Sequence, residues 1–181
     1  MLTPNDMLDF WYGDTMRAKW FASTPQLDAE IRALYETVWE AALLGKWDDW
    51  LSSADGCLAL TIILDQLPLN MFRGTAKSLS SEARSRDVAR HAIDQGLDKQ
   101  IDSSRLAFLY MPFMHSENMA DQDLSVALYE AAGLENNARF AKHHRDIVRR
   151  FGRFPHRNAI LGRMSTQEEL DYLNSKEAFK G

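Results

Sequence analysis

The segment His143–Arg163, HHRDIVRRFGRFPHRNAILGR, is where side chains able to do chemistry are densest. It holds three histidines and six arginines, with Asp146 as its acidic residue, in a chain of formal net charge −5. Arginine binds carboxylates and phosphates through two parallel hydrogen bonds, and histidine titrates near neutral pH. The pattern therefore predicts a focused anion site, or an internal pairing of charges, rather than a broad basic surface.

The leading hypothesis is a helical binding domain with a polar pocket for a small anion or an acidic peptide. An arginine at the start of a helix opposes the helix dipole, so Arg157 should have an anionic partner: Asp65, Glu117, Asp121 or a ligand. Asn158 would orient the donors. The predicted ligand-binding residues combine this segment with an earlier one, LDQLPLNMFRG: Arg149, Arg153, His156, Arg157, Asn158, Arg163, Arg73 and Asn70.

A second hypothesis is an enzyme that uses acid–base or metal-assisted hydrolysis. Its candidate catalytic residues are Asp65, His115, Glu117 and His156. If a helix begins near Ser116, Glu117 and Asp121 are four residues apart and share a face, which makes His115, Glu117 and Asp121 weak candidates for metal ligands. Helix capping explains Ser116 and Glu117 equally well, and the spacing matches no established metal motif. We therefore expect no metal or cofactor.

A third hypothesis assigns these motifs a structural role, with partner binding elsewhere. Asp65 follows the apolar run CLALTIIL (57–64) and should be buried. A buried carboxylate is costly unless it is paired, so Arg73 or an arginine of residues 145–163 should contact it. Such pairs would form a buried salt-bridge network that joins helices.

The elements that must position these side chains are helices. Thr24-Pro25 begins one that ends at Gly45, and further helices are predicted from Ser81 to Gly96 and from about Glu117 to Gly133. Two more run from Glu135 to Phe151, before Gly152, and from a capping box at Thr166–Glu169. Strand patterns are missing from the sequence, so the predicted class is all-α.

Four prolines recur at nearly equal spacing: Pro25, Pro68, Pro112 and Pro155. Proline ends or kinks a helix because it lacks an N–H and clashes with the preceding turn. The spacing therefore favours helix breaks that separate stacked antiparallel hairpins, as in an α-solenoid or a compact helical array. Chance spacing is the alternative interpretation.

Composition sets the remaining limits. A chain of 181 residues with 45% hydrophobic residues suits one domain, 1–181, or two tightly fused halves. Cys57 is the single cysteine, which excludes an internal disulfide and suits a reducing compartment. The sequence shows neither a signal peptide nor a membrane span, so we expect a cytoplasmic protein. Its acidity argues against nucleic acid, and a homodimer or a protein partner stays open.

Three motifs resemble the bacterial domain-of-unknown-function 924 family: DQLPLNMFRGTA, FLYMPFMHSENMADQ, and HRDIVRRFGRFPHRNAILGR followed by STQEEL. The opening FWYG (10–13) is similar too, and Leu69 stands where the resemblance leads us to expect an arginine. The resemblance implies a tetratricopeptide-like helical fold and brings no activity, cofactor or substrate. The W-x₂-L-G-x₂-Y pattern is absent, and the proline spacing is longer than that consensus repeat, so any relation is to the hairpin architecture.

Overall fold

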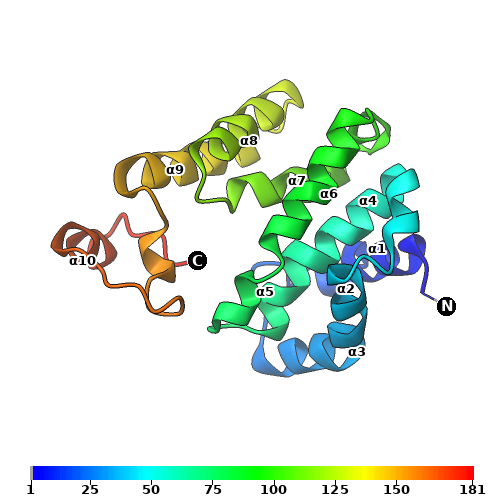
Figure 1. The fold of residues 1–181 in the computed structure, drawn as a ribbon, viewed down its shortest axis with the longest axis horizontal. Helices are drawn as coiled ribbons and strands as arrows, with labels where there is room; N and C mark the ends of the chain where they lie inside the picture. Colours follow the sequence, from blue (N-terminus) through cyan, green and yellow to red (C-terminus); the bar gives the residue numbers. More distant parts are fainter. Residues whose placement is uncertain (1) are drawn as a thin grey trace. The chain divides into compact units, whose positions relative to one another are not determined.

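The computed structural model describes residues 2–181, which form helices and turns without a strand, so the all-α prediction is confirmed. The chain divides into two compact units (Figure 1). Unit 1 comprises the residues up to Arg73 and Lys77–Pro112; unit 2 comprises Gly74–Ala76 and Phe113–Gly181. The elements are α1 (Pro4–Tyr12), α2 (Asp14–Arg17), α3 (Pro25–Leu43), η1 (Asp48–Ser52), α4 (Ala54–Thr61), η2 (Ile62–Gln66), α5 (Leu67–Met71), η3 (Ala76–Leu79), α6 (Glu82–Asp94), η4 (Asp98–Gln100), α7 (Ser103–Met114), α8 (Met119–Ala131), α9 (Glu135–Phe151), η5 (Pro155–Arg157) and α10 (Gln167–Leu173).

The core of unit 1 is the apolar run predicted to be a buried helix. Residues 57–64 form the end of α4 and the start of η2, and every one of their side chains is buried. Helix α4 packs against α1 and α6, while α3 packs against α5. Cys57 lies inside this core, where burial raises the pKa of its thiol to about 11. It is a small core residue, as its sequence context predicts.

Pro68 does not break this helix, contrary to the prediction. The element before it, η2, is a π-helix, in which the Leu67 N–H bonds the Ile62 carbonyl. Pro68 then occupies the first turn of α5, and the helical chain continues to Met71. A missing N–H is tolerated in a first turn, and the wide π turn relieves the steric clash.

The other prolines also occupy unlike positions. Pro25 opens α3 behind the capping Thr24, as expected. Pro112 lies inside α7, which continues to Met114, so the predicted break there is wrong. Pro155 opens η5. Equal spacing therefore does not mark equal structural positions, and tetratricopeptide-like stacking stays a prediction.

Unit 2 is built on a hairpin of α8 and α9, which lie side by side (Figure 1). Helix α9 has the predicted bounds and ends at Gly152, whose φ of 72° is the left-handed conformation that favours glycine. Helix α8 begins later than predicted, because the Asn118 side chain caps it by accepting from the Ala120 N–H at 2.8 Å. Glu117 therefore precedes the helix and does not share a face with Asp121.

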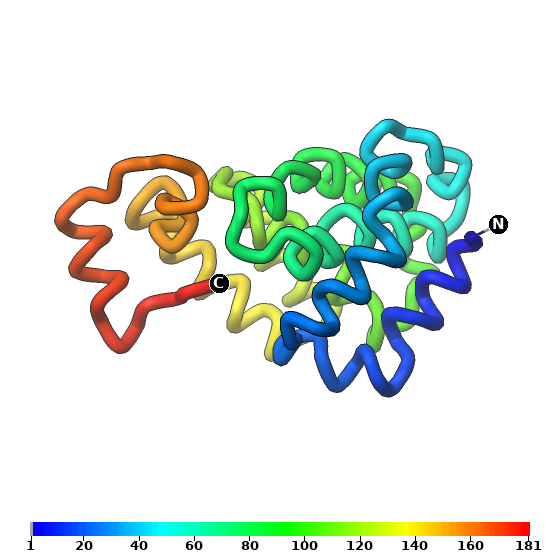
Figure 2. Tube along the Cα trace, turned by 90° about the horizontal axis from the view of Figure 1, so that it is seen from below, coloured from blue at the N-terminus to red at the C-terminus, as the bar shows by residue number. Residues whose placement is uncertain are grey.

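After α9 the chain forms η5, a loop, α10 and a final segment, which Figure 2 traces from orange to red. The capping box at the start of α10 is present as predicted: the Thr166 side chain accepts from the Glu169 N–H, and Glu169 accepts from the Thr166 N–H. Ile147, Val148, Phe154 and Tyr172 form a hydrophobic core cluster in this unit.

In the part of the chain that the structure describes, none of the helices is long and apolar enough to cross a membrane.

Candidate functional site

The predicted arginines of unit 2 converge with carboxylates of their own chain. Arg163 meets Glu117 through two bonds, Nη1 to Oε2 at 2.7 Å and Nη2 to Oε1 at 2.8 Å. Glu117 also accepts the backbone N–H of Phe154 at 2.7 Å. The pair thus ties the segment before α8 to the loop that follows η5.

A second arginine makes an equivalent pair with α10. Arg153 donates to Glu169 through Nε at 2.7 Å and through Nη2 at 2.9 Å. The same Nη2 bonds the backbone oxygen of Met164 at 2.8 Å. The Glu169 side chain is only 2% exposed, and that of Arg153 is 27% exposed. This pair is therefore partly buried.

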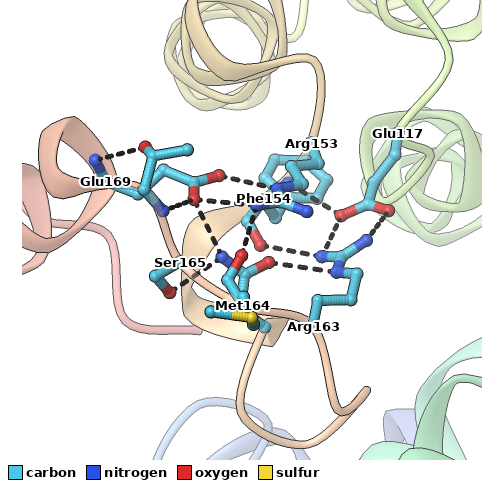
Figure 3. A network of polar contacts seen from close by, with 9 residues as sticks. Glu117, Arg153, Phe154, Arg163, Met164, Ser165 and Glu169 are labelled. Atoms are coloured by element: carbon cyan, nitrogen blue, oxygen red, sulfur yellow. Dashed lines mark hydrogen bonds and ion pairs between the residues drawn. The ribbon is translucent and has the colours of Figure 1, made fainter.

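Asn158 joins the two pairs (Figure 3). Its amide nitrogen donates to Glu169 at 3.2 Å and to the Ser165 hydroxyl at 3.0 Å, and its oxygen accepts from Arg163 at 3.0 Å. Buried Asn158 orients guanidinium and carboxylate groups of the protein itself. The arrangement agrees with the salt-bridge-network hypothesis for these residues.

The network holds both carboxylates in their ionised form. Burial opposes ionisation of Glu117, but the bonds from Arg163 and the Phe154 N–H outweigh it and lower the pKa of this carboxyl group. The bond from Arg153 lowers the pKa of Glu169 to about 2, with help from the Thr166 N–H. Neither carboxyl group is suited to act as a general acid near neutral pH.

The remaining arginines of the motif have different surroundings. Arg157 is buried, with its guanidinium carbon 4.8 Å from the centre of the Phe154 ring, and its charge helps to lower the pKa of Glu117. Arg149 is exposed on α9 and pairs with Asp146 at 3.0 Å. Arg150 is also exposed and reaches Glu168 at 2.8 Å.

One groove of unit 2 borders this network. It has a volume of about 380 Å³ and lies between the end of α9 and the start of α10, where it is lined by Arg150, Phe151, Arg153, Thr166, Glu168 and Glu169. The Arg150 guanidinium carbon lies 4.7 Å from the centre of the Phe151 ring. Of the predicted binding residues, Arg153 alone lines this groove. A larger groove of about 450 Å³ in unit 1 is bordered by Asp55, which disfavours an anion there.

Two predicted binding residues form a separate cluster in unit 1. Arg73 bonds Asp28 through Nε at 2.7 Å and Nη2 at 3.2 Å, and the Asn70 amide donates to the same carboxylate at 2.8 Å. Asp65 is buried in η2, where the Gln66 amide donates to it at 2.6 Å. The predicted pairing of Arg73 with Asp65 is wrong, because Asp28 takes that guanidinium.

The metal candidates do not gather around a common point. The Asp121 carboxylate accepts from the Ser116 hydroxyl at 2.7 Å, whereas Glu117 turns to Arg163. Between residues 2 and 181, the structure has no group of three or more His, Cys, Asp or Glu side chains placed to hold a metal ion. His115 is half-buried in the same unit.

His156 contacts aromatic side chains instead of an anion. Its ring centre lies 5.6 Å from that of Phe154 and 5.0 Å from that of Phe179. Burial, together with the neighbouring Arg157 charge, lowers the pKa of His156 to about 4. His144 on α9 is also buried, and its Nδ1 lies 2.8 Å from the Phe140 carbonyl.

Sequence reasoning missed several of these residues. Glu169 was interpreted only as a helix cap, although its carboxylate also receives Arg153. The apolar periodicity of α9, Ala141, Ile147 and Val148, places His144 on the buried face, and this pattern could have identified it. Phe179 lies beyond the last predicted helix, where no motif pointed to it.

The polar network and its groove lie in a stretch that a family model covers. The model for a bacterial protein of unknown function, DUF924, matches residues 7–177. The chain belongs to the DUF924 family. The resemblance noted from the motifs is thereby confirmed, and it extends over almost the whole sequence.

A solved structure is similar to this DUF924 protein throughout. It is that of a protein of unknown function from Agrobacterium tumefaciens, with 39% sequence identity and a TM-score of 0.88. The match covers 94% of this chain and 96% of the other. No curated protein matches the DUF924 chain.

Proposed function

We propose that this DUF924 protein is a binding module that holds a carboxylate-bearing ligand, a small organic acid or an acidic peptide, in the groove beside Arg150 and Arg153. The observation that carries the proposal is the Arg150–Glu168 ion pair, which lines this groove and whose guanidinium lies over the ring of Phe151. The groove volume falls within the range of small-ligand sites.

The two ion pairs of the groove differ in how readily a ligand replaces them. Arg150 and Glu168 have side chains 51% and 61% exposed, and such solvated pairs contribute only about 0–1 kcal/mol. A ligand carboxylate can therefore take the place of Glu168 on Arg150 at little cost. Glu169 is buried and held by Arg153, Asn158 and the Thr166 N–H, so it stays as a fixed wall.

Phe151 gives the groove an apolar surface beside the guanidinium. A ligand that combines a carboxylate with a short apolar chain can use both groups, because the charge meets Arg150 while the chain covers the ring. An inorganic anion would contact Arg150 but would leave the Phe151 ring uncovered. The chemistry therefore favours an organic acid or an acidic side chain on a peptide.

The other predicted donors support a structural role. Arg163, Arg157, Asn158 and His156 lie among partners of their own chain, as the salt-bridge-network hypothesis expects. Asn158 bonds Ser165 and Arg163 in the loop that follows η5, which leads to Thr166 at the edge of the groove. The two hypotheses are thus compatible: the network builds the wall, and Arg150 receives the ligand.

The test compares Arg150→Ala with Arg149→Ala, two exposed arginines in the last turn of α9. Glutarate and the peptide acetyl-Glu-Glu-Glu-amide are titrated by NMR, with the arginine Nε–H signals as the readout. Because a charge-assisted hydrogen bond is lost, Arg150→Ala should weaken binding about tenfold or more, whereas Arg149→Ala should change it by less than about twofold.

A third variant gives a result with the opposite sign. Glu168→Gln removes the carboxylate that competes for Arg150, so binding of the same probes should tighten. Equal weakening in Arg149→Ala and Arg150→Ala would show non-specific attraction to net charge. That result, or unchanged Arg150 signals with both probes, would refute the proposal.

A further inference from the structure

The final segment of the chain lies across an aromatic pocket of unit 2. Residues 178–181 have no regular secondary structure, and the ring of Phe179 packs against two imidazoles. Its centre lies 4.5 Å from that of His144 and 5.0 Å from that of His156, with interplanar angles of 61° and 85°. These are the edge-to-face arrangements that aromatic rings prefer.

The pocket has a buried floor and three histidine walls. Phe154 is 1% exposed, and its ring centre lies 5.6 Å from those of both His144 and His156. His143 contributes a more distant ring, 6.3 Å from Phe179. A side chain added at Gly181 would approach the His156 ring to 3.1 Å, so the chain passes close over that imidazole.

The two imidazoles nearest to Phe179, those of His144 and His156, carry little charge at neutral pH. Burial lowers the pKa of His144 to about 3, and burial with the Arg157 charge lowers that of His156 to about 4. Neutral imidazoles over a phenylalanine floor suit an aromatic guest better than an ion. The pocket therefore differs in chemistry from the arginine groove.

The segment that fills the pocket is lightly held. Phe179 is half-buried against the core cluster that contains Phe154 and Tyr172, and one hydrogen bond fixes its backbone, from its N–H to the Tyr172 hydroxyl at 2.9 Å. Ser175, Lys176 and Glu177 are exposed. Ordering several residues for one partly buried ring leaves little net stabilisation. Docking of the segment should therefore be reversible.

We propose that the pocket of His143, His144, Phe154 and His156 is a binding site for a phenylalanine side chain on an extended peptide. Residues 178–181 occupy it within the same molecule and act as a displaceable competitor. A partner segment that carries a phenylalanine and has no regular secondary structure binds when this segment leaves. The segment Ala-Phe-Lys-Gly is itself the template for the ligand, since its ring and backbone already fit the pocket.

This site is separate from the groove of the proposed function. None of its four residues is among those that line the groove, where Arg150 and Glu168 are the exchangeable pair. Arg150→Ala therefore leaves the pocket intact, and Phe179→Ala leaves the groove intact. Either proposal can fail while the other holds.

The test uses the full chain with Phe179→Ala and the peptide Ser-Lys-Glu-Ala-Phe-Lys-Gly, the sequence of residues 175–181. Phe140→Ala is the matched control, because Phe140 is an exposed ring of the same unit. If the internal segment is docked in about nine molecules of ten, Phe179→Ala should bind the peptide about tenfold more tightly than the wild type. Phe140→Ala should bind it like the wild type.

The imidazole proton signals of His144 and His156 locate the binding. They should shift in Phe179→Ala, because the ring over them is gone, and return towards their wild-type positions as peptide is added. A peptide with alanine in place of phenylalanine should do neither. Equal binding of both peptides, or equal affinity of the wild type and Phe179→Ala, would overturn the proposal.

A measurement on the wild type keeps the proposal testable if Phe179→Ala does not fold. The Phe179 amide, bonded to Tyr172, should exchange its hydrogen much faster than the Val148 amide inside α9, because the segment opens without unfolding the unit. Equal protection of the two amides would show that the segment is a permanent part of the core, and the site would then not exist.

Discussion

Two buried titratable groups of unit 2 differ in whether they are charged, because their neighbours differ. Glu169 is buried with Arg153, Asn158 and the Thr166 N–H, so its carboxylate stays ionised. His144 is buried among aromatic rings and other histidines, so its imidazole stays neutral. A partner of opposite charge decides the outcome, because desolvation alone always disfavours the charged form.

At the residue scale, this difference predicts how stability depends on pH. The pKa values of His144 and His156 are lowered from 6.5 to about 3 and about 4. As the pH falls, these histidines therefore take up protons in the unfolded chain before they do so in the folded protein. The contribution of these neutral histidines to the free energy of unfolding is complete above pH 6.5 and is lost as the pH falls from 6.5 towards their folded pKa values. The lowered pKa values of Glu117 and Glu169 change the stability only below about pH 4.5, which is the ordinary pKa of a glutamate.

The measurement is the melting temperature at about pH 7 and about pH 5. His144→Phe should reduce the loss seen in the wild type, whereas His143→Phe, at the exposed neighbouring position, should keep it. Each loss of about 1 kcal/mol corresponds to about 2–4 °C in a chain of this size. An unaltered pH dependence in His144→Phe would contradict the assignment.

At the scale of elements, the local sequence predicted where several helices begin and end, but it did not predict which residues pair over long distances in the chain. Thr24, Gly152 and the Thr166 capping box act within one turn, so their residue types alone predict them. The partners of Arg153 and Arg163 lie sixteen and forty-six positions away. Those pairings depend on how the helices pack, which neither composition nor spacing contains.

Pro68 and Pro112 show the limit of a local rule. Each was expected to end a helix, yet one lies in the first turn of α5 behind a π turn and the other lies inside α7. The rule describes a regular α-helix, and the buried packing of these segments outweighs the cost of the lost bond. The network residues were identified by type, and their anion-binding role stays a prediction, because the type of a side chain does not determine which partner it contacts.

Gly152 offers a direct test at this scale. Its φ of 72° ends α9, and its N–H bonds the Val148 carbonyl at 2.7 Å. Gly152→Ala should destabilise the protein by about 1–2 kcal/mol in urea unfolding, because an L side chain disfavours this conformation. Gly152→Asn is the control, since asparagine tolerates it better, and a larger loss for asparagine than for alanine would contradict the explanation.

At the scale of the whole molecule, the sequence predicts one domain or two tightly fused halves, and the contacts divide the chain into two units. Helix α7 contributes residues to both, with the division after Pro112. Because α7 is one continuous helix, its backbone hydrogen bonds run across this division, so unfolding either unit alone would fray α7. We therefore predict that the units unfold in one cooperative transition.

Phe154→Ala tests this cooperativity. Removal of a fully buried ring from unit 2 should cost about 3–5 kcal/mol, and the exposed Phe140→Ala should cost about 0.5 kcal/mol or less. In hydrogen exchange, amides of α4 and α9 should then accelerate by the same factor. Acceleration confined to α8–α10 would show that the two units unfold independently.

The π turn in η2 contains one residue more than an α-helical turn would need. The Leu67 N–H reaches back five residues to the Ile62 carbonyl, one more than in an α-helix. Deletion of a single residue between them would restore the ordinary spacing and leave α4 and α5 in phase. The same deletion within α4 would rotate every later side chain by about 100° relative to the core. The deletion in η2 would, however, leave Pro68 inside a regular α-helix, where its ring clashes with the preceding turn. The extra residue of the π turn and the proline that follows it therefore have to be kept or lost together.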